Sequence, residues 1–298
     1  MATSKEMKWG ITGGSGQLAR SLVDLLSAKS IEHIAWSRAE LDITDSSCIT
    51  SIGDYRPDIL VNCAAWTNVD GAEDAFEDAL KVNRDGARNA AVAAKELNIP
   101  LIHVSTDYVF SGSESTPWNV DHTTQPTSKY GLSKLLGEER VQEIWPEKSY
   151  IVRTAWLYGA YGKNFAKTIL KKAIGTNDLI YVVNDQTGQP TTTSDVADRI
   201  FAIAESQVPT GIYHATNSGQ ASWWEFAREL VELSHNDVTR VVPVDSKQFQ
   251  TKANRPKFSV LDHSKWGKVG FQPMRDWRSA LIAVFPEIEA HVMKELSK

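Results

Sequence analysis

Near its start the chain reads Lys8-Trp9-Gly10-Ile11-Thr12-Gly13-Gly14-Ser15-Gly16-Gln17-Leu18-Ala19. The first five residues form a short β-prone run, and the leucines that follow have helical spacing: Leu18, Leu22, Leu25 and Leu26. The stretch therefore predicts a strand, a glycine turn and a helix. Glycines let backbone N–H groups approach a pyrophosphate, and a helix N-terminus favours its negative charge. We expect a dinucleotide to bind at Gly13, at Gly16 and at the first residues of the helix.

Further strand-like runs follow along the first half of the chain, at about residues 31–37, 58–65, 100–105 and 149–154. Helical patterns separate them, at about 44–54, 73–97 and 130–144. Strict alternation of strands and helices predicts an α/β fold built on a doubly wound parallel sheet of the Rossmann type. The third run ends in Ala64-Ala65, two small residues against which a cofactor can lie.

The regular alternation weakens after about residue 156. We expect residues 1–155 to form an NAD(P)-binding Rossmann domain and residues 156–298 to form mainly a smaller, substrate-binding domain. Residues from about 176 to 215 are expected to return to the first domain. The sequence contains no internal repeat and no Pro- or Gly-rich linker that would separate the two more sharply.

The end of the second strand bears on the choice of cofactor, because it lies beside the adenosine ribose in sheets of this kind. An acidic residue there accepts the ribose hydroxyls of NAD, whereas a nearby arginine accommodates the 2′-phosphate of NADP. The chain has Ser37-Arg38, which favours NADP(H). NAD(H) stays open, since Arg38 is also typical of a solvated loop. Asp42 is expected to be free to reach the adenine, with Thr44 or Asp45 capping the next helix.

A catalytic set is predicted by Tyr130 and Lys134, which are four residues and therefore about one helical turn apart. A phenol ionises at about pH 10, and a neighbouring ammonium lowers that pKa. Thr106 follows the strand at 100–105 and can hydrogen-bond the same oxygen. Together the three are expected to protonate a carbonyl as a hydride arrives. A Tyr-Lys pair alone is more typical of a half-buried Tyr beside a solvated Lys, so the assignment depends on the glycine turn.

Composition argues against several classes of function. The 298 residues carry a net charge of −5 and have a pI near 5.8, and this acidic balance does not indicate binding to nucleic acid or to an anionic membrane. The sequence shows no secretory segment and no apolar run of membrane length, which favours a cytoplasmic protein. The two cysteines, Cys48 and Cys63, predict neither a disulfide framework nor a metal site.

Several motifs extend beyond these general features. Tyr130-Gly131-Leu132-Ser133-Lys134 accompanies the glycine turn, and three longer runs are more distinctive: Ser105-Thr106-Asp107-Tyr108-Val109-Phe110-Ser111-Gly112, Asp185-Gln186-Thr187-Gly188-Gln189-Pro190-Thr191 and Arg255-Pro256-Lys257-Phe258-Ser259-Val260-Leu261-Asp262. On the first two features the chain resembles the extended short-chain dehydrogenase/reductases. On the longer runs it resembles, more narrowly, the dTDP-4-dehydrorhamnose reductase family, along nearly its whole length.

The resemblance implies roles for the residues that match the family's motifs. The implied catalytic group is Tyr130 as proton donor, Lys134 as its modulator and ribose ligand, and Thr106. The implied cofactor contacts are Gly16, Gln17 and Leu18 at the pyrophosphate, Asp42 and Ile43 at the adenine, and Ala65, Trp66 and Thr67 at the inner half. The implied substrate contacts are Val69, Asp70, Asp107 and Trp156.

Two further groups have competing interpretations. Arg255 matches the bidentate geometry of a diphosphate, but a surface salt bridge is nearly as typical of such a residue. Trp223 and Trp224 are expected to lie in a helix and to pack against neighbouring elements rather than to contact ligand. Lys163 is expected on a solvated helix face, from which it could still reach a nucleotide phosphate.

By resemblance, the chain would use NADPH or NADH to reduce the C4 ketone of dTDP-4-dehydro-L-rhamnose, giving dTDP-L-rhamnose. Two alternatives stay open. The substrate could be another nucleotide-linked 4-keto-6-deoxyhexose, or the chain could be a non-catalytic, NADP-binding regulatory subunit. Resemblance alone also leaves open a dependence on Mg²⁺ and assembly as a homodimer.

Overall fold

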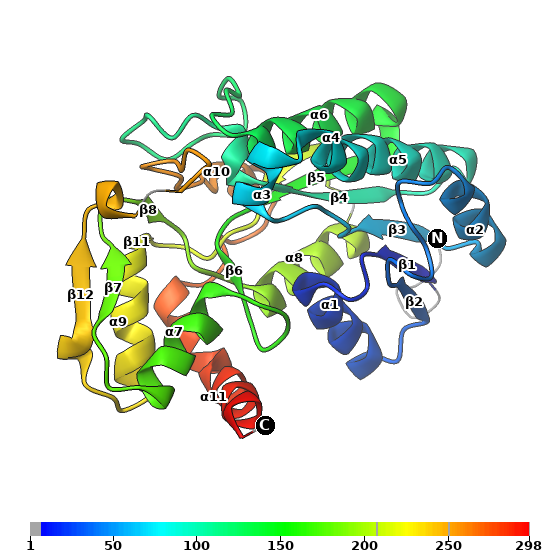
Figure 1. Cartoon of the computed structure of the whole chain (residues 1–298). Helices are drawn as coiled ribbons and strands as arrows, with labels where there is room; N and C mark the ends of the chain where they lie inside the picture. The colour runs from blue at the N-terminus through cyan, green and yellow to red at the C-terminus, as the bar shows by residue number, and fades with distance from the viewer. Residues whose placement is uncertain (1–6, 207, 250, 298) are drawn as a thin grey trace.

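A six-stranded parallel sheet forms the centre of the computed structural model, which describes residues 7–206, 208–249 and 251–297 (Figure 1). The strand order is β10-β5-β4-β3-β1-β2. The strands are β1 (Trp9–Thr12), β2 (His33–Trp36), β3 (Ile59–Asn62), β4 (Leu101–Thr106), β5 (Ser149–Thr154) and β10 (Gly211–His214). Because β2 and β3 lie on opposite sides of β1, the strand order reverses there, and ligands bind outside the carboxyl ends at such a point. The predicted doubly wound sheet is confirmed.

Helices cover both faces of this sheet (Figure 1). One face is covered by α1 (Gln17–Ala28) and α8 (Thr193–Glu205), and the other by α2 (Ser47–Tyr55), α5 (Gly86–Glu96) and α6 (Lys129–Ile144). The helical leucine pattern positions α1, since Leu18, Leu22 and Leu26 are all buried against the sheet. Burial of each such side chain stabilises the fold by about 1.5–3 kcal/mol.

The long helical stretch expected at about 73–97 is confirmed over most of its length, because residues 76–96 are helical without interruption. It is not uniformly α-helical: after α3 (Val69–Asp74) and an interruption at Ala75, the chain forms α4 (Phe76–Leu80), a π-helical turn (Lys81–Asp85) and then α5. Within that turn, the buried side chain of Asn83 accepts from the backbone N–H of Trp66 at 2.8 Å and donates to its carbonyl at 3.1 Å. A single π turn re-aims one side chain within an otherwise α-helical path, which spacing alone does not reveal.

A second hydrophobic core lies beside the sheet, in what we call the C-terminal lobe (Figure 1). Its elements are α7 (Phe165–Gly175), β7 (Ile180–Val183), α9 (Trp223–Leu233), β12 (Val241–Val244) and α11 (Trp277–Leu296). Two short pairs connect it to the sheet: β6 (Leu157–Tyr158) with β9 (Thr191–Thr192), and β8 (Thr187–Gly188) with β11 (Ala221–Ser222).

The chain passes between the sheet and the C-terminal lobe more than once. Within the stretch from about 176 to 215, β7 packs in the lobe, whereas α8 and β10 join the sheet. Near the other end of the chain, α10 (Ser264–Lys268) places Trp266 in the core beneath the sheet. Residues distant in sequence are therefore brought to one boundary between the two parts.

Candidate functional site

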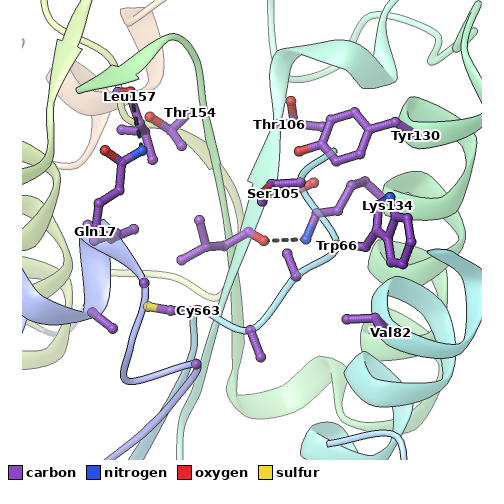
Figure 2. A pocket seen from close by; sticks show the side chains of 18 of the residues that line it. Gln17, Cys63, Trp66, Val82, Ser105, Thr106, Tyr130, Lys134, Thr154 and Leu157 are labelled. Atoms are coloured by element: carbon purple, nitrogen blue, oxygen red, sulfur yellow. Dashed lines mark hydrogen bonds between the residues drawn. The ribbon is translucent and has the colours of Figure 1, made fainter. Parts of the chain in front are cut away.

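A cavity of about 760 Å³ opens at the carboxyl edge of the sheet, beside the C-terminal lobe (Figure 2). The predicted site residues that line it are Gly13, Gly16, Gln17, Leu18, Arg38, Asp42, Ile43, Ala64, Ala65, Thr67, Val69, Thr106, Asp107, Tyr130, Lys134, Trp156 and Arg255. Ser37 and Asp70 lie outside this lining. The structure thus gathers residues from separate strand ends into one concave site.

The glycine turn after β1 forms one wall of the cavity. Gly13 has a φ of +71°, and a Cβ atom there would lie 2.7 Å from the backbone of Ala64. A Cβ atom at Gly14 would lie 2.6 Å from the carbonyl oxygen of Ala35. No side chain caps the N-terminus of α1 at Gly16, so N–H groups of its first turn face the cavity. This uncapped helix end and the tight glycine backbone fit the phosphates of a dinucleotide.

Thr106, Tyr130 and Lys134 meet on the opposite wall (Figure 2). Thr106 is the last residue of β4, and Tyr130 is in the first turn of α6, which Ser128 caps by accepting from the N–H of Gly131 at 3.1 Å. A Cβ atom at Gly131 would lie 2.2 Å from the carbonyl oxygen of Tyr108. The glycine therefore allows α6 to approach the segment that follows β4, and this approach brings Tyr130 to Thr106.

The charge state of this group differs from the sequence prediction. Burial raises the pKa of the Tyr130 phenol above its usual value, while hydrogen bonding from Thr106 acts in the opposite direction. The expected decrease in the Tyr130 pKa is therefore not seen, because burial outweighs it, and the Lys134 ammonium donates to the carbonyl of Val104 at 2.7 Å. Burial lowers the pKa of Lys134 to about 8, against the opposing charge of Glu138. At neutral pH, both Tyr130 and Lys134 therefore carry their protons.

Asp107 lies next to Thr106 and is almost completely buried. Its Oδ1 accepts from the Thr106 hydroxyl at 3.0 Å, and its Oδ2 has no hydrogen-bond partner among the described residues. Burial raises the pKa of this carboxyl to about 6, while the nearby Ser259 and Thr106 hydroxyls act to lower it. Asp107 thus fixes the Thr106 hydroxyl at the cavity wall and carries a carboxylate that is only weakly stabilised there.

Trp156 occupies a strained position at the boundary with the C-terminal lobe. Its φ is +46°, in the left-handed region that bulky residues rarely adopt. Its indole stacks on that of Trp223, with ring centroids 3.5 Å apart and planes 7° apart. A Cβ atom at Gly188 would lie 2.5 Å from the same indole. The Trp223 stack and the bare backbone of Gly188 together accommodate Trp156 in this unusual conformation.

The chain matches known proteins over nearly its full length. The family model described as the RmlD substrate binding domain matches residues 7–289. A dTDP-4-dehydrorhamnose reductase from Streptomyces griseus is 45% identical to the chain over 287 residues, which cover 94% of each protein. The chain belongs to the dTDP-4-dehydrorhamnose reductase family. A crystal structure of such a reductase from Bacillus anthracis, in complex with NADP, matches it with a TM-score of 0.91 and 37% identity, covering 94% of this chain and 99% of the other.

Members of this reductase family do not all carry the same name. A dTDP-4-keto-6-deoxy-D-glucose reductase from Streptomyces niveus is 39% identical to the chain, covering 95% of this chain and 98% of the other. Relatives of similar identity are thus named for different keto sugars, so family membership alone does not fix the sugar.

Arg255 forms a salt bridge, as one of its two interpretations predicted, whereas its contact with a diphosphate stays a prediction. It lines the cavity, and its Nη2 atom also lies 2.7 Å from Oδ2 of Asp70 in an ion pair. The other oxygen of Asp70 accepts from the backbone N–H of Ala253 at 3.0 Å. Asp70 therefore positions Arg255 from behind, while Val69 beside it reaches the cavity.

The residues after β2 also differ from expectation. The hydroxyl and the backbone N–H of Ser37 both donate to the carboxylate of Glu40, at 2.7 and 2.8 Å. Asp42 was predicted to be free, but its carboxylate accepts from the backbone N–H and the hydroxyl of Thr44, at 2.9 and 2.8 Å. These bonds hold its pKa below the usual range. Arg38 remains mostly exposed at the cavity edge, 3.4 Å from Asp42.

Several lining residues were missed or assigned elsewhere by sequence reasoning: Ser105, Leu157, Gly162, Lys163 and Trp223. Lys163 lies in the loop before α7, not on the solvated helix face that was predicted. Trp224 does pack in the lobe, donating from its indole to the carbonyl of Val241, whereas Trp223 turns to the cavity. The capping box at Ser222 is the available signal, since it starts α9 at Trp223 and so places that residue at a helix end.

Metal binding and membrane insertion have no structural support in the described chain. Within residues 7–206, 208–249 and 251–297, no group of three or more His, Cys, Asp and Glu side chains could hold a metal ion. The Mg²⁺ considered by resemblance therefore has no ligand set there. Over the same ranges, no helix has both the length and the apolar character that a membrane span requires.

Proposed function

We propose that the chain uses NADPH to reduce the C4 ketone of dTDP-4-dehydro-L-rhamnose, giving dTDP-L-rhamnose. The observation that carries this proposal is the shared cavity: the uncapped end of α1 forms one wall, and Thr106, Tyr130 and Lys134 form the other. The relative from Streptomyces griseus supplies the identity of the sugar, through its name.

The proposed chemistry assigns proton transfer to this chain's own residues. Bound NADPH supplies the hydride that adds to C4. The electron pair of the C=O bond moves to oxygen, and Tyr130 donates its phenolic proton there, so that the ketone becomes a secondary alcohol. Even with its raised pKa the phenol is a sufficient acid, because an alkoxide is about as basic as hydroxide, whose conjugate acid has a pKa of about 15.7. Thr106 would turn its hydroxyl from Asp107 to donate to the same oxygen, and the Lys134 ammonium would stabilise the phenolate that remains.

The cofactor contacts follow from the walls of the cavity. Gly13, Gly16, Gln17 and Leu18 would hold the pyrophosphate, Arg38 the 2′-phosphate, and Asp42 and Ile43 the adenine. Ala64, Ala65, Thr67 and Lys134 would border the inner half. The exposed guanidinium of Arg38 supports NADPH over NADH, because arginine matches phosphate geometry and, among the residues that the structure describes, its ion pair is with Asp42, at 3.4 Å.

The substrate would occupy the side of the cavity nearer the C-terminal lobe. Trp156 offers an indole face beside the catalytic group, and Arg255 offers a cation for the diphosphate. Val69 and Asp107 would complete this group, and Asp70 would orient Arg255 from outside the lining. Binding energy from the nucleotide half would place the ketone against Tyr130.

The test is turnover of purified protein with NADPH and dTDP-4-dehydro-L-rhamnose, followed by loss of absorbance from the reduced nicotinamide. We expect oxidation of NADPH and formation of dTDP-L-rhamnose. A panel of nucleotide-linked 4-keto-6-deoxyhexoses would separate this substrate from the second candidate, for which the relative from Streptomyces niveus is the supporting observation. Folded protein that binds NADPH but turns over none of these sugars would exclude the reductase and favour a regulatory subunit. Cytoplasmic location and homodimer assembly stay predictions.

A further inference from the structure

Below the catalytic group lies an ion pair that the proposed chemistry does not use. Arg153, near the end of β5, donates to Glu138 on α6 through Nε at 2.9 Å and through Nη2 at 2.6 Å. Both side chains are only 2% exposed. The guanidinium of Arg153 also lies over the ring of Phe110, 5.0 Å from its centroid. The pair is therefore bidentate, buried and held from two sides.

Such a buried ion pair is not expected to add much net stability to the fold. Removing two charges from water costs several kcal/mol per ion by order of magnitude, and hydrophobic residues of similar volume often replace a buried pair without loss. Its placement suggests another role. Glu138 follows Lys134 by four residues on α6, so their Cβ atoms are about 5–6 Å apart on one helix face. Glu138 thus shares a helix face with the buried Lys134 and is paired with the buried Arg153.

Three titratable groups near Lys134 are uncharged at neutral pH, whereas the carboxylate of Asp107 in the same cavity wall is bonded to Thr106. Burial raises the pKa of the Cys63 thiol at the end of β3 to about 12. Burial also holds the pKa of His103 on β4 far below its usual value, and raises that of Tyr130. Among these described neighbours, Glu138 is the group that carries the compensating negative charge.

We propose that Glu138 is a positioning residue that keeps Lys134 protonated in the buried cavity wall, and that Arg153 holds the Glu138 carboxylate in place. The proposal rests on the proposed function of Lys134 beside Tyr130. Burial draws the pKa of Lys134 down to about 8, and the Glu138 charge opposes that decrease. Lys134 is charged below its pKa, so loss of Glu138 would decrease the charged fraction of Lys134 at neutral pH and weaken its stabilisation of the phenolate.

The direct test is the titration of Lys134 in protein labelled with ¹³C at lysine Cε, followed by NMR from pH 5.5 to 10. The Lys134 signal is assigned by its loss in Lys134→Arg. We expect Glu138→Gln to lower the Lys134 midpoint by at least about one pH unit. The matched control is Glu139→Gln, which removes the same charge from the next, exposed residue of α6 and should leave the midpoint in place. In parallel, the basic limb of kcat/KM against pH should move down with the midpoint.

A folded Glu138→Gln protein whose Lys134 midpoint matches the unsubstituted protein would overturn the proposal, because a merely structural pair changes stability without moving that titration. If the single variant does not fold, Glu138→Gln combined with Arg153→Met removes both buried charges. The titration midpoint of Lys134 in that double variant is then compared with that of the unsubstituted protein. The NMR readout needs no turnover, so failure of the proposed reaction and failure of this inference are distinguishable.

Discussion

The two sides of the cavity are built in different ways. The sheet side uses strand ends, a glycine turn and the first turns of α1 and α6, each of which is formed by a short local sequence pattern. The side at the C-terminal lobe depends on contacts between distant segments, such as Trp156 with Trp223 and Arg255 with Asp70. The comparison suggests that the sheet side determines cofactor binding and proton transfer, whereas the lobe side determines the fit of the sugar nucleotide.

The largest expected effect tests the sheet side. Tyr130→Phe removes the proton donor and should lower kcat about 10³-fold, within the range for a general acid. The dissociation constant for NADPH should change less than about twofold, as measured by nicotinamide fluorescence, because the ring remains in place. Tyr108→Phe is the matched control, since Tyr108 packs edge-to-face on Tyr130 with centroids 5.5 Å apart, and it should lose less than about tenfold. A Tyr130→Phe enzyme with kcat within tenfold of the original would show that another group donates the proton.

A glycine on the lobe side gives the next largest effect. Gly188→Ala would place a Cβ atom 2.5 Å from the Trp156 indole and displace it. Overpacking of this kind costs about 2 kcal/mol, which corresponds to about a 30-fold higher KM for the sugar nucleotide. NADPH affinity should stay unchanged. Gly267→Ala is the control, because no atom lies within 4 Å of the added Cβ. If Gly188→Ala weakened NADPH instead, the division between the two sides would be wrong.

The cofactor preference is a smaller effect on the sheet side. Arg38→Ala should raise the dissociation constant for NADPH about tenfold and leave that for NADH unchanged. A charged hydrogen bond is worth about 1.5–3 kcal/mol, and the exposure of Arg38 reduces this. Arg140→Ala, on the far part of α6, controls for a general loss of positive charge. Equal weakening of both cofactors would place Arg38 elsewhere than at the 2′-phosphate.

The smallest expected effect is on stability and depends on pH. The pKa of Asp107 is about 6 in the fold, above its ordinary value of 3.8, so the folded state prefers the neutral carboxyl. Above pH 6 the buried charge costs stability, and this cost disappears as pH decreases through 6 toward 3.8. Asp107→Asn should therefore raise the free energy of unfolding by about 1 kcal/mol at pH 8, after its lost hydrogen bonding is subtracted, and by less at pH 5. Denaturant titrations at both pH values measure this, with exposed Asp121→Asn as the control. A gain that is the same at both pH values would exclude this explanation.

The sequence predicts the sheet side of the cavity better than the side at the C-terminal lobe. The strand from Ser149 to Thr154 and the start of α6 near Tyr130 depend on local patterns, and the structure confirms both. The π turn at Lys81–Asp85 contains Asn83, whose side chain bonds to the backbone of Trp66, seventeen residues away, and no periodicity records that contact. The stack of Trp223 on Trp156 joins residues from different parts of the fold. The raised pKa of Tyr130 arises from burial, a property of the assembled cavity and not of the Tyr-Lys spacing.

The path of the chain through the two parts has a consequence for cooperativity. The helix α8 and the strand β10 return to the sheet after the chain has passed through the C-terminal lobe. The part of the molecule that contains the sheet is therefore not one continuous segment of the sequence. A fragment that ends at residue 155 would lack Val196, Ile200 and Ile203 of α8, which cover the same face of the sheet as α1. The apolar face of the sheet that α8 covers would then be exposed to water. The two parts therefore form one interdependent folding unit. We expect that neither part folds correctly when it is truncated or transferred alone to another protein.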